Sequence, residues 1–259
     1  MPATEARSLA GLRGEQVVCP TAEECAASLA GTLAQHLKHR MDVVGQTHLA
    51  LSGGSSGRLL CVALAGEARL GASEWARIHL WMVDERSVPD DDPRLNFGLI
   101  CDALVAHVPL PAGNLHPMPV LQADGAERYQ RELRDALAGR QDASERRLDA
   151  VVLGMGGDGH TASLFPGTPA LDEQERWVVI NDGERVAPPR PRMTMTYPFL
   201  NRAHFIALLV TGAGKKEILQ RVAENSGDRH ALPVTGVIPA PSSRMLWFLD
   251  LAALPPSAK

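Results

Sequence analysis

Cysteine is scarce in this sequence of 259 residues, and the four cysteines include no Cys-x-x-Cys pair. All except Cys19 lie in apolar, helix-like contexts, so we predict reduced, buried thiols and no disulfide framework. No apolar run approaches the length of a membrane span, and residues 1–7 contain no apolar signal core. These absences predict a soluble, cytoplasmic protein with no membrane partner.

Positive charge is also limited, because the net charge is −4. A nucleic-acid surface needs a clustered basic face, so we predict no nucleic-acid partner. No His, Cys or carboxylate cluster has metal-ligand spacing, and Asp90 to Asp92 is expected to be a solvated acidic turn before Pro93. The Gly-x-x-x-x-Gly-Lys-Ser/Thr loop of nucleotide-binding proteins is missing as well. We therefore predict neither a metal nor a cofactor.

What the chain does contain is an alternation of apolar strands and helices, without internal repeats or a low-complexity linker. Strands are predicted at 47–51, 77–83, 148–153, 176–180, 193–196, 203–210 and 245–249, and helices at 21–40, 58–70, 95–106, 126–137 and 215–224. The residues before position 47 are predicted to form one helix and a tail. This order predicts a single α/β domain over residues 1–259, with a doubly wound, mostly parallel sheet and helices on both faces.

Glycine-bearing turns follow three of these strands, at Ser52 to Gly57, at Gly154 to Thr161 and at Thr211 to Gly214. Each turn is expected to open a helix, whose first N–H groups and positive dipole end favour an anion. The strongest signal is Gly-Met-Gly-Gly-Asp-Gly-His-Thr at 154–161, after the strand at 148–153. It places His160 at the carboxyl edge of the sheet, where open α/β folds bind ligands. An imidazole side chain is a common general base near neutral pH. The pattern indicates chemistry on a phosphorylated small molecule.

Two other interpretations of the glycine motifs are less favourable. Gly154-x-Gly156-x-x-Gly159 satisfies the dinucleotide fingerprint, but Phe165-Pro166-Gly167 would end the following helix within two turns, and the motif lies past the middle of the chain. A serine esterase would present its serine in Gly-x-Ser-x-Gly. That string is absent, and the nearest serine, Ser55, lies in a loop that resembles a phosphate cradle.

In motif order the chain resembles the 6-phosphogluconolactonases, whose relatives are glucosamine-6-phosphate deaminases and ribose-5-phosphate isomerases. The resemblance is carried by Ser52-Gly53-Gly54-Ser55, Trp81-x-x-Asp84-Glu85-Arg86-x-Val88, the stretch from Gly154 to Pro166, Arg192-Met193-Thr194-Met195-Thr196 and Gly212-x-Gly214-Lys215. One departure is Leu95, before Asn96, where the family often has serine. The resemblance implies a fold of the NagB/RpiA/CoA transferase-like type and a phosphosugar lactone as substrate.

The family's reaction, opening of a lactone by water, needs a base, donors for the oxyanion and contacts to the remote phosphate. The resemblance implies that His160 is the base and that Asp158 supports it. For substrate binding it implies Gly53, Gly54, Ser55, Asp84, Arg86, Gly156, Gly157, Arg192 and Lys215. Neither a metal nor a cofactor is implied, and the oligomeric state is expected to be a monomer or a small homo-oligomer. The extended segment from Pro188 to Pro191 could be a connector or could hold arginines over the site.

Two alternatives remain open. A sugar-phosphate isomerase or deaminase of the related family has glutamate before the proline and Asp-Glu-Tyr in the second motif, whereas this chain has Phe165 and Arg86. A phosphosugar-sensing regulator would add a DNA-binding helix-turn-helix domain, and no basic recognition helix precedes the first predicted strand. Hydrolysis of 6-phospho-D-glucono-1,5-lactone in the oxidative pentose phosphate pathway is therefore the favoured prediction.

Overall fold

The main sheet of the protein has seven strands, and every neighbouring pair is parallel. The structure of the protein is a computed structural model that describes residues 8–140, 142–181, 191–225 and 227–256. The strand order is β1 (Glu15–Cys19), β10 (Arg244–Asp250), β9 (Phe205–Val210), β6 (Ala150–Leu153), β2 (Thr47–Leu51), β3 (Ile78–Met82) and β5 (Leu115–His116). This confirms the prediction of a mostly parallel α/β sheet.

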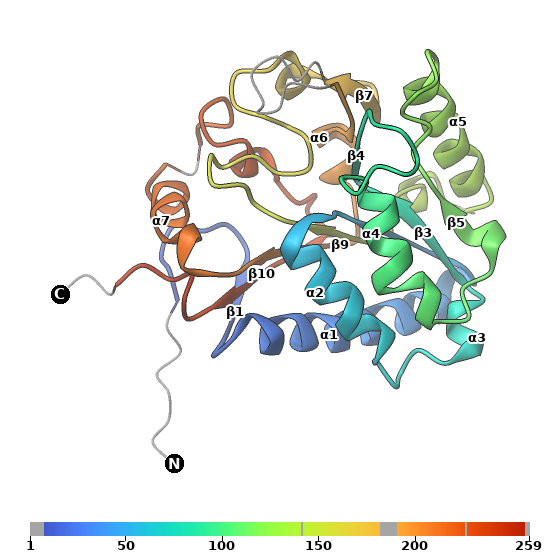
Figure 1. The fold of residues 1–259 in the computed structure, drawn as a ribbon, viewed down its shortest axis with the longest axis horizontal. Helices are drawn as coiled ribbons and strands as arrows, with labels where there is room; N and C mark the ends of the chain where they lie inside the picture. Colours follow the sequence, from blue (N-terminus) through green and yellow to red (C-terminus); the bar gives the residue numbers. More distant parts are fainter. Residues whose placement is uncertain (1–7, 141, 182–190, 226, 257–259) are drawn as a thin grey trace.

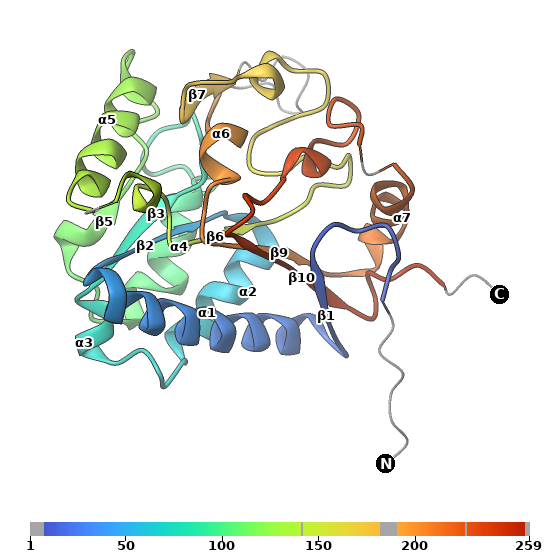
Figure 2. The ribbon, with the colours of Figure 1, turned by 180° about the vertical axis from the view of Figure 1, so that it is seen from behind.

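Helices cover this sheet on two sides (Figures 1 and 2). In both views α1 (Ala22–Val44) and α2 (Gly54–Ala65) lie below the sheet, and α5 (Gly125–Ala138) and α6 (Tyr197–Leu200) lie above it. The remaining helices are α3 (Ala72–Trp75), α4 (Asn96–Ala103) and α7 (Lys216–Glu224). In α1, Leu29, Leu33 and Leu37 follow at four-residue spacing and are fully buried, because this spacing places them on one face of a helix.

The strand β1 corrects the prediction that the residues before position 47 form only a helix and a tail. β1 pairs with β10, near the other end of the chain, and forms an edge of the sheet. Its sequence Glu-Gln-Val-Val-Cys is only partly buried, so the apolar pattern of a central strand is missing. In contrast, β2, β6 and β9 are buried at every position. Their apolar runs reflect a sheet that is covered on both faces.

The order of the strands reverses between β2 and β6. From β2 the chain adds β3 and then β5 on one side, and it later adds β6, β9 and β10 on the other. Ligands of open α/β sheets bind outside the carboxyl ends of the strands at such a reversal. The glycine-bearing turns after β2 and β6 therefore meet at the position in the fold that favours ligand binding.

A second, antiparallel sheet of three strands was not predicted. It consists of β4 (Asp84–Arg86), β8 (Arg192–Met195) and β7 (Val178–Asn181), in that order. The N–H of Met195 donates to the carbonyl of Val83 at 2.8 Å, which joins this sheet to the end of β3. The sequence predicted strands at 176–180 and 193–196 but not β4 or its antiparallel pairing with β8, because that pairing joins segments separated by β5, α5 and β6.

The turn after β6 does not open a helix, and that prediction is wrong. Residues 154–168 form consecutive turns, followed by a 3₁₀ turn at Pro169–Asp172. The other two glycine turns do lead into helices. Gly53 is the N-cap residue of α2, which begins four residues earlier than predicted, and Gly212 precedes a 3₁₀ turn that leads into α7. Glycine clusters mark close backbone turns whether or not a helix follows.

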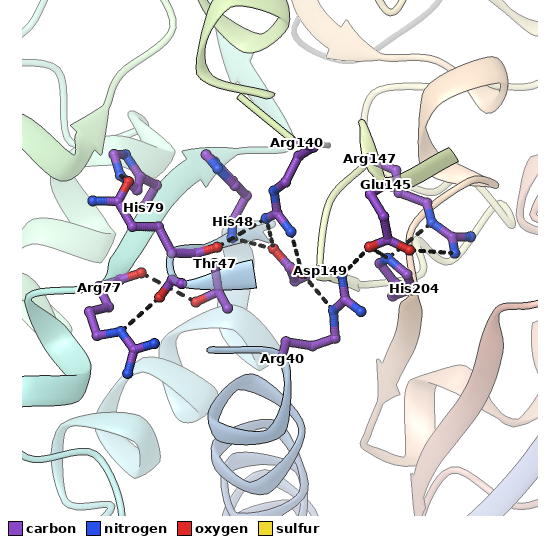
Figure 3. Close-up of polar contacts among 12 residues, drawn as sticks. Arg40, Thr47, His48, Arg77, His79, Arg140, Glu145, Arg147, Asp149 and His204 are labelled. Carbon is purple, nitrogen blue, oxygen red and sulfur yellow. Dashed lines mark hydrogen bonds and ion pairs between the residues drawn. The ribbon is translucent and has the colours of Figure 1, made fainter. Parts of the chain in front are cut away.

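At the amino end of β6, the carboxylate of Asp149 lies at the centre of a buried ionic cluster (Figure 3). Its oxygens accept from Arg40 Nε at 2.8 Å, from Arg140 Nη2 at 2.6 Å and from the N–H of His48 at 2.8 Å. Arg40 also pairs with Glu145. Asp149 is fully buried, and Arg40 and Arg140 are each 8% exposed. This cluster joins α1, β2 and the segment before β6 at the edge of the sheet opposite the carboxyl ends.

The four cysteines of the chain all lie in the described residues. Cys19, Cys25, Cys61 and Cys101 are all free, and three of them are buried. In the described part of the chain, no helix combines the length and apolarity that a membrane crossing needs.

Candidate active site

Most of the predicted site residues surround one cavity of about 310 Å³ at the carboxyl ends of β2 and β6. The predicted residues that line it are Gly53, Gly54, Ser55, Asp84, Arg86, Gly156, His160, Arg192 and Lys215. They come from the turns after β2, β6 and β9 and from strands β4 and β8 of the small sheet. Segments distant in sequence thus meet at the reversal of strand order.

His160 and Asp158 form a hydrogen-bonded pair at the cavity. Nδ1 of His160 lies 2.5 Å from Oδ1 of Asp158, and the same oxygen accepts the backbone N–H of His160 at 3.1 Å. Burial alone would raise the pKa of Asp158, but the contact with His160 more than offsets this and lowers it. An ionised carboxylate only accepts, so the proton of a neutral His160 lies on Nδ1. Nε2 is then the free basic nitrogen.

The loop that carries this pair is closed by two hydrogen bonds between its own residues. The N–H of Gly156 donates to the carbonyl of His160 at 2.8 Å, and the hydroxyl of Thr161 donates to the carbonyl of Gly154 at 2.8 Å. Ala162 has a φ of 51° and is the only non-glycine residue with positive φ in the described part of the chain. Such backbone conformations are costly and concentrate at functional sites. The loop therefore holds His160 in a tight turn rather than on a helix.

Substituting alanine for Gly156 tests this loop. A Cβ on Gly156 would lie 2.1 Å from Nδ1 of His160 and 2.6 Å from Oδ1 of Asp158, so the pair must move. We expect Gly156→Ala to lower the kcat of this site about 10- to 100-fold, because small misplacements of a catalytic group have effects of that size. Gly157→Ala is the matched control, since a Cβ there meets nothing within 4 Å. Equal activities of the two variants would contradict the expectation.

Cationic groups gather on the other walls of the cavity. Burial lowers the pKa of Arg192, and the neighbouring charge of Arg86 lowers it further. Burial also lowers the pKa of Lys215, whose Nζ donates to the carbonyl of Met155 at 2.6 Å. Helix α2 begins at the cavity with Gly53 as its N-cap residue and no side-chain cap. Three cationic side chains and a helix N-terminus make this cavity suited to an anion.

Several polar atoms at the cavity are buried without a protein partner. Five side-chain atoms of the described residues are in this condition, and four of them belong to residues that line the cavity: Ser52 Oγ, Arg86 Nε, Asn96 Oδ1 and Arg192 Nε. Buried polar groups are normally paired, and unpaired ones in one place indicate a ligand site. Two guanidinium donors, a hydroxyl and an amide acceptor match a ligand that has both anionic oxygens and hydroxyl groups.

The structure also places residues that the sequence analysis had not assigned to the site. The side chain of Asn96 is 2% exposed and lies against Gly53. The ring of Phe165 lies 4.6 Å from that of His160 between centroids, and the guanidinium carbon of Arg192 lies 5.9 Å from the Phe165 ring centre. Ser163 lines the cavity, and its buried hydroxyl donates to Asp84 at 2.7 Å rather than to the imidazole of His160. The only sequence signal for these residues was their place within the family motifs.

Other predicted residues lie elsewhere. Gly157 and Asp158 are exposed and do not line the cavity, and we therefore omit Gly157 from the proposed binding residues. His116, which was not among the predicted site residues, is buried away from the cavity and is stacked on Trp81 with ring centres 3.7 Å apart. Pro188 to Arg190 lie outside the described residues. Asp92 pairs with Arg94, and no group of three metal-binding side chains occurs in the described part of the chain.

Comparison with known proteins shows what this arrangement resembles. Residues 20–247 match the family model of glucosamine-6-phosphate isomerases/6-phosphogluconolactonase. The chain is 38% identical to the 6-phosphogluconolactonase of Rattus norvegicus over 235 residues, covering 89% of each chain. It is 39% identical to the GDH/6PGL endoplasmic bifunctional protein of Homo sapiens, covering 93% of this chain but 30% of that protein. The chain therefore spans about a third of the length of that relative.

A solved structure supports the fold assignment. The crystal structure of 6-phosphogluconolactonase from Thermotoga maritima is similar with a TM-score of 0.75 and 25% sequence identity, and the match covers 91% of this chain and 99% of that one. The fold of this chain is thus shared with a protein of distant sequence.

Proposed function

Because the chain belongs to the family of glucosamine-6-phosphate isomerases and 6-phosphogluconolactonases, we propose that it hydrolyses 6-phospho-D-glucono-1,5-lactone to 6-phospho-D-gluconate. The reaction belongs to the oxidative pentose phosphate pathway. The observation that carries the proposal is the combination of a His160–Asp158 pair with buried, unpaired guanidinium donors in one cavity. Lactone hydrolysis requires both a base for water and donors for anionic oxygens.

In the proposed mechanism, Nε2 of His160 takes a proton from water as the water oxygen attacks the lactone carbonyl. Asp158 holds the proton on Nδ1 and stabilises the imidazolium that forms. The tetrahedral intermediate collapses with cleavage of the bond to the ring oxygen, which takes the proton from His160. No covalent intermediate is needed, because water attacks the ester directly. The hydroxyl of Ser163 donates to Asp84 rather than to His160, so the proposed base is free to act on water.

Two groups of hydrogen-bond donors in the cavity are available to bind the anionic oxygens of the substrate. Lys215 and the first turn of α2, with Gly53, Gly54 and Ser55, form one group, and Arg86 and Arg192 form the other. A helix N-terminus with a lysine favours a phosphate, and a guanidinium matches either a phosphate or the carboxylate of the product. Asp84 and Asn96 add oxygen acceptors for the hydroxyls of the sugar.

The contacts of Phe165 favour lactone hydrolysis over isomerisation or deamination. Ring opening of an amino sugar by His160 would be assisted by an acidic side chain beside the imidazole. At the position where the deaminase motif has glutamate, Phe165 packs its ring against His160. An apolar ring cannot exchange protons. Among the described residues, the carboxylate hydrogen-bonded to the His160 ring is that of Asp158.

The test of the proposal is product formation by the purified protein. Freshly prepared 6-phosphogluconolactone is incubated with and without the protein, and the 6-phosphogluconate formed is measured after subtraction of the spontaneous rate. We expect hydrolysis well above the blank. A rate equal to the blank, together with turnover of glucosamine 6-phosphate or another sugar phosphate, would replace the proposal by the isomerase or deaminase alternative.

A cytoplasmic location, a single domain over residues 1–259 and a monomer or small homo-oligomer belong to the same proposal. Cell fractionation checks the location. Light scattering after size-exclusion chromatography checks the oligomeric state.

A further inference from the structure

Glu85 lies beside the cavity without lining it. It is the middle residue of β4, between Asp84 and Arg86, and is 1% exposed. Its Oε1 accepts the N–H groups of Arg86 at 2.7 Å and of Asn96 at 2.9 Å, and its Oε2 accepts the N–H of Phe97 at 2.8 Å. Burial raises the pKa of Glu85, and the three N–H donors offset this only in part. A carboxylate is thus kept in the interior next to the site, held by backbone donors.

Two of these donors belong to the first residues of α4. The N-cap residue of this helix is Leu95, which makes no side-chain cap. The first N–H groups of a helix need acceptors from outside the helix, and a carboxylate also interacts favourably with the dipole there. Glu85 supplies this acceptor from a different element. Leucine at position 95, where the family often has serine, cannot accept these N–H groups. The start of α4 therefore depends on Glu85.

The start of α4 in turn positions Asn96. Its Nδ2 donates to the carbonyl of Asp84 at 3.0 Å, and its Oδ1 is one of the unpaired atoms at the cavity. The fit is close, because a Cβ on Gly53 would lie 2.0 Å from this oxygen. A small shift of α4 would therefore move a polar atom that faces the proposed substrate.

Hydrogen bonds also link Glu85 and the segment before α4 to Arg86. Glu85 binds the backbone N–H of Arg86, and the guanidinium of Arg86 donates through Nη1 to the carbonyl of Arg94, two residues before Asn96. Nε of Arg86 remains buried and unpaired. The backbone of Arg86 and the carbonyl that orients its side chain are thus both fixed relative to Glu85, one directly and one through the start of α4.

We propose that Glu85 is a positioning residue for substrate binding, which holds Arg86 and Asn96 in the cavity through the capped start of α4. This inference rests on the proposed lactonase function for its substrate. Glu85 itself contacts none of the reacting atoms. Its contribution is expected in the affinity for the phosphosugar rather than in the chemical step.

The variant Glu85→Gln tests the proposal, because the amide keeps the shape but sets an NH₂ group against the N–H of Phe97. We expect KM for 6-phosphogluconolactone to rise about tenfold, the effect of weakening one hydrogen bond from Arg86 or Asn96 to the substrate, while kcat changes less than twofold. The dissociation constant for 6-phosphogluconate, measured by calorimetry, should rise by the same factor. An unchanged KM with a lowered kcat would overturn the proposal.

A double-mutant cycle separates positioning from general destabilisation. If Glu85 acts through Arg86, the effect of Glu85→Gln on KM should be markedly smaller in an Arg86→Met background, so that the two effects do not multiply. Multiplying effects would overturn the proposal. Glu145→Gln, which removes a carboxylate from the ionic cluster at the opposite edge of the sheet, is the control and should lower stability without changing KM.

Two further measurements keep the test decisive. If Glu85→Gln does not fold, Glu85→Asp retains the charge but withdraws it by one methylene, and it should raise KM in the same direction. If the wild-type protein binds 6-phosphogluconate but hydrolyses no lactone, the proposed function fails while the calorimetric comparison of wild type and Glu85→Gln still decides the role of Glu85.

Discussion

Replacement of His160 by alanine is expected to lower kcat/KM for 6-phosphogluconolactone by about 10²–10⁴-fold, the usual contribution of a positioned general base. The imidazole lines the cavity, and Asp158 at 2.5 Å from Nδ1 leaves Nε2 as the basic atom. The arginines and Lys215 that we assign to substrate binding are unchanged in this variant, so KM should change little. The measurement is the initial rate of 6-phosphogluconate formation, corrected for spontaneous hydrolysis.

Three controls sharpen this result. His107→Ala removes an exposed histidine outside the cavity and should retain full activity. Asp158→Asn should give a smaller loss than His160→Ala, because the base remains but its tautomer and orientation are no longer fixed. Added imidazole should restore part of the activity of His160→Ala by supplying the missing base. Wild-type activity in His160→Ala would refute the assignment of the base.

Substitution of Asp149 by asparagine is expected to have the largest effect on stability. The free energy of unfolding should fall by about 3–5 kcal/mol, since breaking a buried ion pair leaves uncompensated charge in the interior. Arg40 would keep only its pair with Glu145, and Arg140 would lose its ion pair with Asp149. A total stability of roughly 5–15 kcal/mol is usual for a domain, so the loss is a large part of it. Urea denaturation followed by circular dichroism measures the change.

The matched control for Asp149 is an ion pair on the surface. Glu15 and Arg244 form two hydrogen bonds of 2.8 Å, but both side chains are more than half exposed. Solvent screens such pairs, and Glu15→Gln should cost only roughly 0–1 kcal/mol. Similar losses in the two variants would contradict the assignment of the Asp149 cluster as a buried structural centre.

The contribution of Asp149 also depends on pH. Burial by itself would raise the pKa of Asp149, but Arg140 and Arg40 more than offset this, and the pKa lies below its ordinary value of 3.8. Stability from a carboxylate with a lowered pKa is fully present above the unfolded value and is lost as the pH falls through the folded value. The stability difference between wild type and Asp149→Asn should therefore be constant near neutral pH and shrink below about pH 3.8.

Part of the fold follows from local sequence pattern. The buried strands β2, β6 and β9 were predicted because sheets covered on both faces require continuous apolar runs. The edge strand β1 and the small antiparallel sheet were not predicted. β1 and β4 carry weak apolar patterns, and their partners β10 and β8 lie far away in the chain. Pairing over such distances is decided by packing of the whole molecule.

The same division holds for the site. The sequence by itself determined the chemistry that is available, because the glycine turns, His160, Arg86, Arg192 and Lys215 are present in the motifs of one family. Only the tertiary structure decided which of these groups meet in one cavity, and that the loop after β6 is a closed turn without a helix. It also decided that Glu85 fixes the start of α4. Local pattern reports what each residue can do, whereas the distances between side chains arise from contacts between segments that are remote in the chain.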